Sequence, residues 1–160
     1  MTIIDIGLMS QASLDKDMIE KALSGLEGHQ LVGHLGAEFV EDVFTVGAKV
    51  IGKRSAKTFN NSIIINDGIF NSFQRLMTDE NYELENVVAL KGQEKNDKEI
   101  LFDIFGSSGD DMDILVQDYL LDLDVQEDDW LFFPKMGAFS YGLQANMISI
   151  KLPSKFGNFR

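Results

Sequence analysis

The chain has no cysteine among its 160 residues, and this absence excludes several kinds of chemistry at once. A disulfide framework, a thiolate metal site and a thiol nucleophile all require that residue. Only two prolines occur, and neither a low-complexity tract nor an internal repeat is visible, so nothing indicates an array of linker-joined modules. We therefore expect a disulfide-free protein of the cytoplasm.

Basic residues and long apolar runs are also scarce. Fourteen Lys and Arg stand against 26 Asp and Glu, which gives a formal charge of −12. Such a surface repels phosphate backbones and anionic headgroups. No segment approaches the roughly 18 apolar residues of a membrane helix, and the first residues lack the basic and apolar stretches of a secretory signal. Neither nucleic acid nor a membrane is an expected partner.

What the chain does have is a hydrophobic content of 44% with 12 Phe, which is enough to fill a core. Residues 1–38 read as a strand, a helix and a second strand. Ile3–Ile6 and Leu31–Val32 are the two short apolar runs, and Ser13 opens the helix. The helix places its apolar residues on one face, namely Met18, Ile19, Ala22, Leu23 and Leu26. This βαβ pattern indicates a slice of an α/β fold, too small to close a barrel.

Residues 39–160 have a different residue pattern, which is typical of a mainly β domain. Short β-branched and aromatic runs alternate with gaps rich in Gly, Asn, Asp and Ser. The runs are Val43–Lys53, Ser62–Asn66, Val87–Lys91, Glu99–Phe105, Trp130–Phe133 and Phe139–Leu152. We expect a sandwich or open barrel with antiparallel pairing, in which Asp67–Gly68 could form a hairpin turn.

Acidic residues cluster at Asp110–Asp113 and between Asp122 and Asp129, which invites a calcium hypothesis. An EF-hand loop needs alternating oxygen ligands, a glycine at its sixth position and a glutamate at its twelfth, and neither run supplies this set. A solvated acidic face is the favoured interpretation. His29 and His34 have no partner ligand at helical spacing, so we interpret them as ordinary polar residues.

Three segments, in this order, resemble the ornithine decarboxylase family of pyridoxal-phosphate-dependent enzymes. Ile65–Phe73 is similar to the family's N-D-G-x-Y-G-S-F segment, and Gly106–Asp113 to its G-P-x-C-D-x-x-D loop. Asp129–Phe133 with Met136–Ser140 is similar to G-D-W-x-x-F-x-x-M-G-A-Y-T. The resemblance runs from about Ile3 to Leu152, and its specificity comes from the order and spacing of the segments together.

The resemblance implies a fold and a cofactor. Family members carry pyridoxal phosphate in an α/β barrel that is followed by a C-terminal β-sandwich of Greek-key type, and they form head-to-tail dimers with sites at the interface. Residues 1–38 would then be a remnant of the barrel, and 39–160 the C-terminal β-domain. The Schiff-base lysine of the family belongs to a part of the barrel that this sequence does not include. We therefore expect no internal aldimine in this chain.

The positions that hold the cofactor in the family are mostly altered here. The strand ending at Gly7 lacks the further glycines that let backbone amides approach the phosphate. The family's E-P-G-R motif falls on His34, Leu35, Gly36 and Ala37, so only Gly36 keeps its identity. The resemblance thus implies loss of the pyridinium partner at His34 and of the phosphate-binding arginine at Ala37. Phe139 keeps the ring of a phosphate-binding tyrosine without its hydroxyl.

Two carboxylates on the implied substrate side are retained. Gly109 stands at the position of the family's cysteine, which helps to place a proton after carbon dioxide leaves, and Asp110 at the aspartate that contacts the distal amine. Asp67 falls where a second substrate-facing carboxylate is expected. The structural alternative is that Asp67 only holds a turn and Asp110 is a solvated loop residue. We favour that alternative because the rest of the implied site has changed.

Four functions are compatible with this sequence. The leading hypothesis is a non-catalytic homologue that dimerises with itself or docks on a full-length decarboxylase paralogue. An active piece of an ornithine or other basic amino-acid decarboxylase is the alternative. A decoy similar to the antizyme inhibitors ranks third, and antizyme is not an expected partner because its binding surface in those relatives lies mainly in the barrel. An unrelated β-sandwich binding module explains the composition but not the ordered motifs.

Overall fold

The computed structural model describes residues 3–8, 16–34, 37–55, 61–80, 82–90, 100–121, 125–140 and 155–157. Residues Gly36, 122–124 and 141–154 lie outside this part of the chain, and so does most of the run expected at Phe139–Leu152. The elements are β1 (Ile3–Leu8), α1 (Lys16–Leu23), β2 (Gln30–His34), α2 (Ala37–Val40), η1 (Glu41–Val43), β3 (Thr45–Arg54), β4 (Asn61–Ile65), α3 (Arg75–Thr78), β5 (Val88–Leu90), β6 (Ile100–Phe105), β7 (Ile114–Leu121), β8 (Trp130–Phe133) and β9 (Lys155–Gly157).

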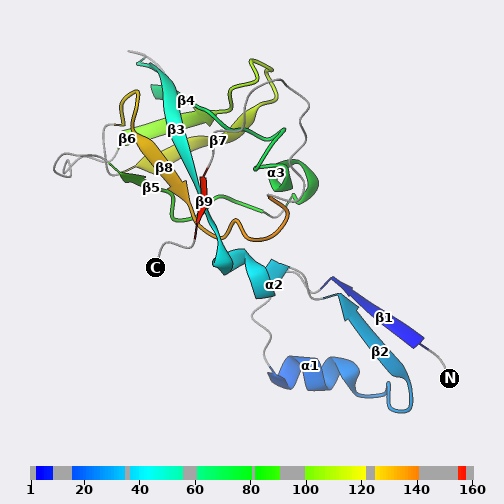
Figure 1. Cartoon of the computed structure of the whole chain (residues 1–160). Helices are drawn as coiled ribbons and strands as arrows, with labels where there is room; N and C mark the ends of the chain where they lie inside the picture. Colours follow the sequence, from blue (N-terminus) through cyan, green and yellow to red (C-terminus); the bar gives the residue numbers. More distant parts are fainter. Residues whose placement is uncertain are drawn as a thin grey trace.

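The first unit is the expected strand, helix and strand. β1 and β2 pair in parallel, with Ile3 opposite Gln30 and Asp5 opposite Val32. A parallel pair needs a crossover between its strands, and α1 lies in that connection. Figure 1 shows this unit beside the larger sheet, with α2 between the two. The βαβ prediction is confirmed.

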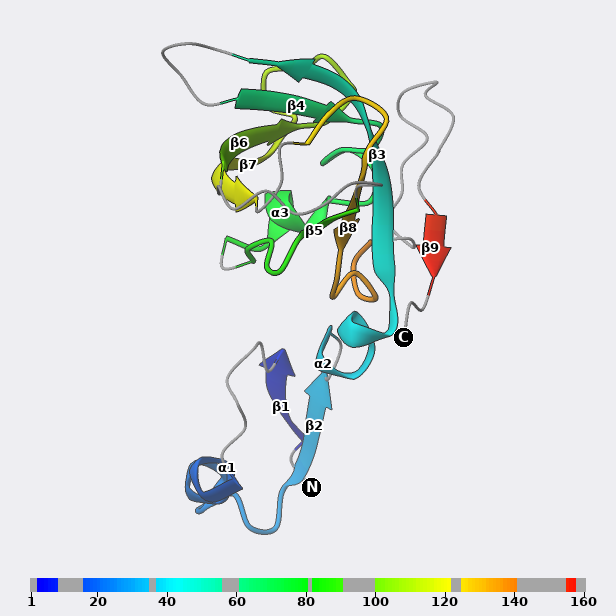
Figure 2. The same cartoon turned by 90° about the vertical axis from the view of Figure 1, so that its left-hand side faces the viewer.

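The larger sheet has the strand order β5-β8-β3-β4-β6-β7, with β9 added on β3. The long strand β3 holds it together. Its first half pairs with β8, with Val46 opposite Phe133, and its second half pairs with β4, with Lys53 opposite Ile63. The register shifts between Val50 and Gly52, where β3 passes from one group of partners to the other. Figure 2 shows the curl that results, which fits the predicted mainly β class.

One strand pair departs from the antiparallel expectation. β4 and β6 run parallel, with Ile63 opposite Ile104, while the other pairs of this sheet are antiparallel. The reason lies directly after β4. The chain does not reverse at Asp67–Gly68 into a hairpin but continues through turns into α3. It then joins the sheet beside β8 as β5, and it returns to β4 only at β6. The hairpin interpretation of Asp67–Gly68 is therefore wrong.

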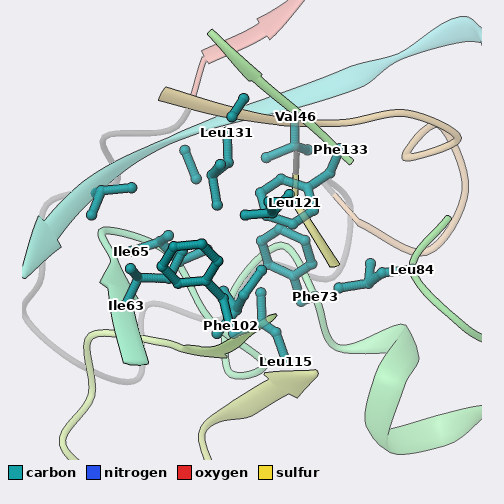
Figure 3. Packing of buried hydrophobic residues seen from close by; sticks show 14 of the residues in the cluster. Val46, Ile63, Ile65, Phe73, Leu84, Phe102, Leu115, Leu121, Leu131 and Phe133 are labelled. Atoms are coloured by element: carbon teal, nitrogen blue, oxygen red, sulfur yellow. The ribbon is translucent and has the colours of Figure 1, made fainter. Parts of the chain in front are cut away.

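The core lies inside the curl of the sheet. Phe73, which follows β4, is buried in this core. The rings of Phe73 and Phe133 meet edge to face, with centroids 4.8 Å apart, a favoured aromatic geometry. Burial of such side chains contributes roughly 1.5–3 kcal/mol each relative to exposure. The fully buried members include Val46, Val50, Ile63, Ile65, Phe102, Ile104, Val125, Leu131 and Phe133. Figure 3 shows many of them in contact across the interior.

The apolar runs predicted β3, β4, β5, β6 and β8 correctly to within one or two residues. No predicted run corresponds to β7 or β9. The pairing of β7 with β6 shifts register between Val116 and Tyr119, next to Asp118, which has a positive φ of 55°. Leu115 and Leu121 on either side of it are both buried. No helix within the described residues is both long and apolar enough to cross a membrane.

Candidate functional site

Asp67 is fully buried and holds its own loop. Its Oδ1 accepts hydrogen bonds from the backbone N–H of Gly68, at 2.7 Å, and of Ser72, at 3.1 Å. Its Oδ2 accepts from the Ser72 hydroxyl at 2.6 Å. These bonds satisfy backbone donors as the chain leaves β4, and they stabilise the turns that follow the strand. Both carboxylate oxygens are thereby used within residues 67–72.

Asp113 joins this loop to the loop between β6 and β7. Its Oδ1 accepts from the Ile69 N–H at 2.9 Å, and its Oδ2 from the Ser108 N–H at 3.0 Å. The carboxylate packs so closely on Gly68 and Gly106 that a Cβ on either glycine would overlap it. Asp113 is only 2% exposed. The solvated-face interpretation of Asp110–Asp113 is therefore wrong for this residue.

Gly109 and Asp110 form the exposed tip of the loop that Asp113 anchors. The Asp110 Oδ1 accepts from the Met112 N–H at 2.8 Å, and the Ser108 hydroxyl accepts from the Asp110 N–H at 3.2 Å. Gly109 has a φ of +75°, and no described heavy atom lies within 4 Å of a Cβ built there. The loop thus presents a carboxylate to solvent on an ordered turn, with open space at Gly109.

The structure brings the two candidate loops together through Asp113, but it does not gather the remaining candidates around them. Ala37 is buried at the start of α2, and Phe139 is 45% exposed in the turn after β8. Gly7 lies in β1 and His34 ends β2, where Leu8 is its register partner. Those two strands belong to the smaller sheet rather than to the curled one.

A charged cluster that sequence reasoning missed lies beside Phe139. The Arg75 side chain is buried, with its Nη1 3.3 Å from the Glu41 carboxylate and its Nε 3.3 Å from that of Asp79. The guanidinium carbon lies 4.2 Å from the centre of the Tyr82 ring and 5.9 Å from that of Phe139. The spacing of Arg75 and Asp79 suits one helical turn. Glu41 is far away in the sequence, and only the fold brings it to the cluster.

Tyr82 closes the cluster on the side of the core. Its hydroxyl donates to the Met136 Sδ at 3.2 Å. Burial raises the pKa of the Tyr82 hydroxyl, and the nearby Arg75 cation partly offsets this rise. Within the described part of the chain, every buried side-chain nitrogen or oxygen has a hydrogen-bond partner. Among those residues, no buried polar side-chain atom lacks a partner, so none indicates a ligand-binding position.

Comparison with known proteins decides the family. The profile of the pyridoxal-dependent decarboxylase C-terminal sheet domain, Orn/DAP/Arg type, matches residues 5–137. The chain belongs to this decarboxylase family. Similar relatives include the chloroplastic ornithine decarboxylase of Nicotiana glauca, 26% identical over 159 residues, covering 91% of this chain and 36% of the relative. Ornithine decarboxylase of Saccharomyces cerevisiae is 25% identical over 131 residues, covering 71% and 28%. The chain thus spans about a third of these decarboxylases.

Solved decarboxylases have the same fold. The Paramecium bursaria Chlorella virus arginine decarboxylase bound to agmatine matches with a TM-score of 0.75 and 21% identity, over 91% of this chain and 41% of that one. The Vibrio vulnificus lysine/ornithine decarboxylase complexed with putrescine matches with a TM-score of 0.72 and 23% identity, over 94% and 42%. The curled mixed sheet is therefore the fold of the C-terminal sheet domain of these decarboxylases.

The family is pyridoxal-dependent, so the donors available for the phosphate of that cofactor can be examined at the positions that the resemblance marks. Ala37 and Phe139 carry no hydrogen-bond donor in their side chains. Arg75, whose guanidinium carbon lies 5.9 Å from the centre of the Phe139 ring, already pairs with Glu41 and Asp79. In the described part of the decarboxylase domain, these residues do not fit a phosphate group.

Proposed function

We propose that this chain is a non-catalytic member of the decarboxylase family that acts by docking on a full-length decarboxylase paralogue. The observation that carries the proposal is the contrast between a complete sheet framework and altered reactive positions. The core, the two loops and their Asp113 connection are all formed. Gly109 and Phe139, by contrast, offer no reactive or phosphate-binding side chain.

The burial of Asp67 supports the loss of catalysis. A carboxylate that recognises a substrate amine must be reachable by that amine, and a buried carboxylate is stabilised where it already accepts several hydrogen bonds. Asp67 is 0% exposed and accepts three hydrogen bonds from Gly68 and Ser72. Its arrangement suits a turn-holding residue better than a substrate ligand.

The loop tip supports the same conclusion. Protonation of the carbanion that decarboxylation leaves requires a positioned acid. Gly109 has no side chain to serve as one, and the whole chain contains no cysteine. Asp110 is exposed, and its Oδ1 is turned back onto the Met112 N–H. A proton donor at this loop would have to come from another chain or from water.

The small sheet supports docking. Within the described residues, β1 and β2 pair only with each other. Parallel strands are normally flanked by further strands and covered on both faces. Here Ile3 is 62% exposed and Val32 37% exposed. An α/β partner that offers another parallel strand or a helix would cover these side chains and satisfy the outer backbone groups of the pair.

Co-purification with a full-length family decarboxylase tests the docking. We expect the tagged chain to retain the enzyme and to change its rate of carbon dioxide release. Val32→Glu, on β2, should reduce the retained fraction at least about tenfold, because it buries a charge at the contact. Ile51→Glu is the control on β3, where Ile51 is 51% exposed, against 37% for Val32, and lies outside the small sheet.

Two results would contradict the docking. The chain could elute alone when it is mixed with the enzyme at concentrations well above those in the cell. Alternatively, Val32→Glu and Ile51→Glu could weaken retention equally, which would indicate non-specific association of apolar surface.

An active decarboxylase piece is the second candidate, and the ordered, exposed carboxylate of Asp110 is the observation that favours it. This candidate predicts that added pyridoxal phosphate, which supplies the electron sink for such chemistry when bound, acquires a protein-dependent absorbance band. Titration of the full chain with pyridoxal phosphate, with free lysine as the reference amine, distinguishes the two candidates. Our proposal expects no band beyond that of the reference.

A further inference from the structure

The side chain of Arg75 fills a cage made by two segments of the chain, η1 and the stretch that follows α3. Glu41 comes from η1, Asp79 follows α3, and the Tyr82 ring follows a few residues later. The two carboxylates contact different nitrogens of the guanidinium, at 3.3 Å each, and the Tyr82 ring lies 4.2 Å from its central carbon. Two anions and an aromatic face are the groups that recognise a planar cation.

The cage is partly shielded from water. The side chains of Arg75 and Glu41 are only 6% and 15% exposed, and that of Asp79 is 32% exposed. A buried charge is costly unless it is paired. Removal of the Arg75 side chain would take the shared cation away from both Glu41 and Asp79, so the empty cage should attract another cation of the same shape.

From this geometry we propose that Glu41, Asp79 and Tyr82 form an alkylguanidinium-binding cage that the chain's own Arg75 occupies. The native chain is therefore closed to external guanidinium ligands at this place. Removal of the Arg75 side chain beyond Cβ opens the cage to them. The inference concerns a site in the sheet domain and holds whether or not the chain docks on a decarboxylase.

Ethylguanidinium is the matching probe, because it has the atoms from Cγ to the two Nη that Arg75→Ala removes. Its planar fork can meet Glu41 and Asp79 through different N–H groups, as Arg75 does. Ethylammonium carries the same charge and alkyl group but presents a compact ammonium that cannot span both acids in one plane. It therefore separates recognition of shape from simple charge neutralisation.

Thermal unfolding of the full-length chain tests the cage. Arg75→Ala should unfold at a lower temperature than the native chain. Ethylguanidinium at millimolar concentration should raise that temperature by about 3–6 °C once it exceeds its Kd roughly tenfold. The native chain should show no rise, and ethylammonium at equal ionic strength should produce less than half of the effect.

Two further variants assign the effect to the cage. Arg75→Ala combined with Glu41→Gln should lose most of the response, whereas Arg75→Ala combined with Glu83→Gln, an exposed acid outside the cage, should keep it. If Arg75→Ala does not fold alone, ethylguanidinium should increase its refolding yield, and ethylammonium should not. The proposal is overturned if ethylguanidinium affects neither stability nor refolding, if it acts equally on the native chain, or if Glu41→Gln leaves the response intact.

Discussion

Neighbouring acids in one short run have opposite environments, which shows how much a residue's role depends on its place in the fold. Asp111 is exposed, while Asp113 is buried and accepts backbone hydrogen bonds from Ile69 and Ser108. The sequence alone made both look like parts of one solvated face. Asp113 instead fixes the loop that carries Asp110, so the geometry of that exposed carboxylate depends on a buried one.

Asp113→Asn tests this role at the residue scale. An amide keeps only one acceptor oxygen and turns its NH₂ toward a backbone N–H, so one buried donor loses its partner. We expect a loss of about 2–3 kcal/mol in the free energy of unfolding, measured by urea denaturation. Asp111→Asn is the control and should change stability by less than about 0.5 kcal/mol. Equal effects of the two substitutions would refute the assignment.

Gly106→Ala tests the close packing around the same carboxylate. A Cβ at Gly106 would overlap Asp113, whereas a Cβ at Gly52 would meet the Ile64 side chain at an ordinary 3.6 Å. We expect Gly106→Ala to destabilise the chain by about 1–3 kcal/mol and Gly52→Ala to be nearly neutral. Chemical denaturation of both variants measures the difference. A neutral Gly106→Ala would show that the loop relaxes without cost.

Tyr82 gives the fold a dependence on alkaline pH. Its pKa in the folded chain is raised above the ordinary value of 10.0, mainly by burial. Between the unfolded and the folded pKa the folded state keeps the proton that the unfolded state has lost, so stability falls as pH rises above about 10. Below about pH 10 the Tyr82 hydroxyl keeps its proton in both the folded and the unfolded state, so its raised pKa costs no stability there. We expect Tyr82→Phe to flatten the decline in melting temperature from about pH 9.5 upward; an unchanged decline would exclude Tyr82 as its source.

At the scale of elements, η1 and the turn after β8 hold each other through backbone contacts. The Gly137 N–H donates to the Glu41 carbonyl at 2.9 Å, and the Met136 N–H donates to the Phe44 carbonyl at the same distance. A Cβ on Gly137 would overlap the Val40 carbonyl. This contact joins the start of β3 to the segment that contains Phe139, and it brings Glu41 into reach of Arg75.

Gly137→Ala should therefore loosen this junction. We expect amide hydrogen exchange at residues 41–44 to speed up by at least about tenfold, because local opening there becomes easier by about 1.4 kcal/mol or more. Exchange in β6 and β7, which are remote in the sheet order, should change far less. Uniform acceleration throughout the sheet would mean a global loss of stability instead, and no acceleration would mean that the junction does not depend on Gly137.

The sequence predicted those elements whose periodicity is regular. β8 follows its apolar run to the residue, and the βαβ pattern before it is formed. No apolar run predicted β7, because its sequence, Ile-Leu-Val-Gln-Asp-Tyr-Leu-Leu, does not alternate apolar and polar residues, and its pairing with β6 contains a register shift next to Asp118. The parallel pairing of β4 with β6 could not be inferred from local patterns, because it depends on where the chain returns after α3.

The site was only partly visible for the same reason. Ordered motifs located the Asp67 loop and the Asp110 loop. Burial and hydrogen-bond partners, which distinguish a turn-holding carboxylate from an exposed one, are set by contacts between distant segments. Glu41 and Arg75 meet only because the fold brings η1, which precedes β3, next to α3. No spacing in the sequence encodes that pair.

At the scale of the whole molecule, the chain combines a well-packed sheet domain with a parallel strand pair that has no further strand partner among the described residues. It spans about a third of its curated relatives. The family fold is retained at 21–26% identity because the buried positions need only apolar side chains of suitable volume. Reactive positions need specific groups, and at two positions that the resemblance marks, Gly109 and Phe139 carry no proton-donating side chain.

Carbon dioxide release is the most direct test of the central claim that the chain is a decarboxylase-family domain without catalysis. The full chain would be incubated with pyridoxal phosphate and carboxyl-labelled ornithine, lysine or arginine, and the released label would be collected. The account predicts release equal to that of pyridoxal phosphate alone, with no difference between the native chain and Asp110→Asn. Release above this level from the native chain, lost in Asp110→Asn, would contradict it.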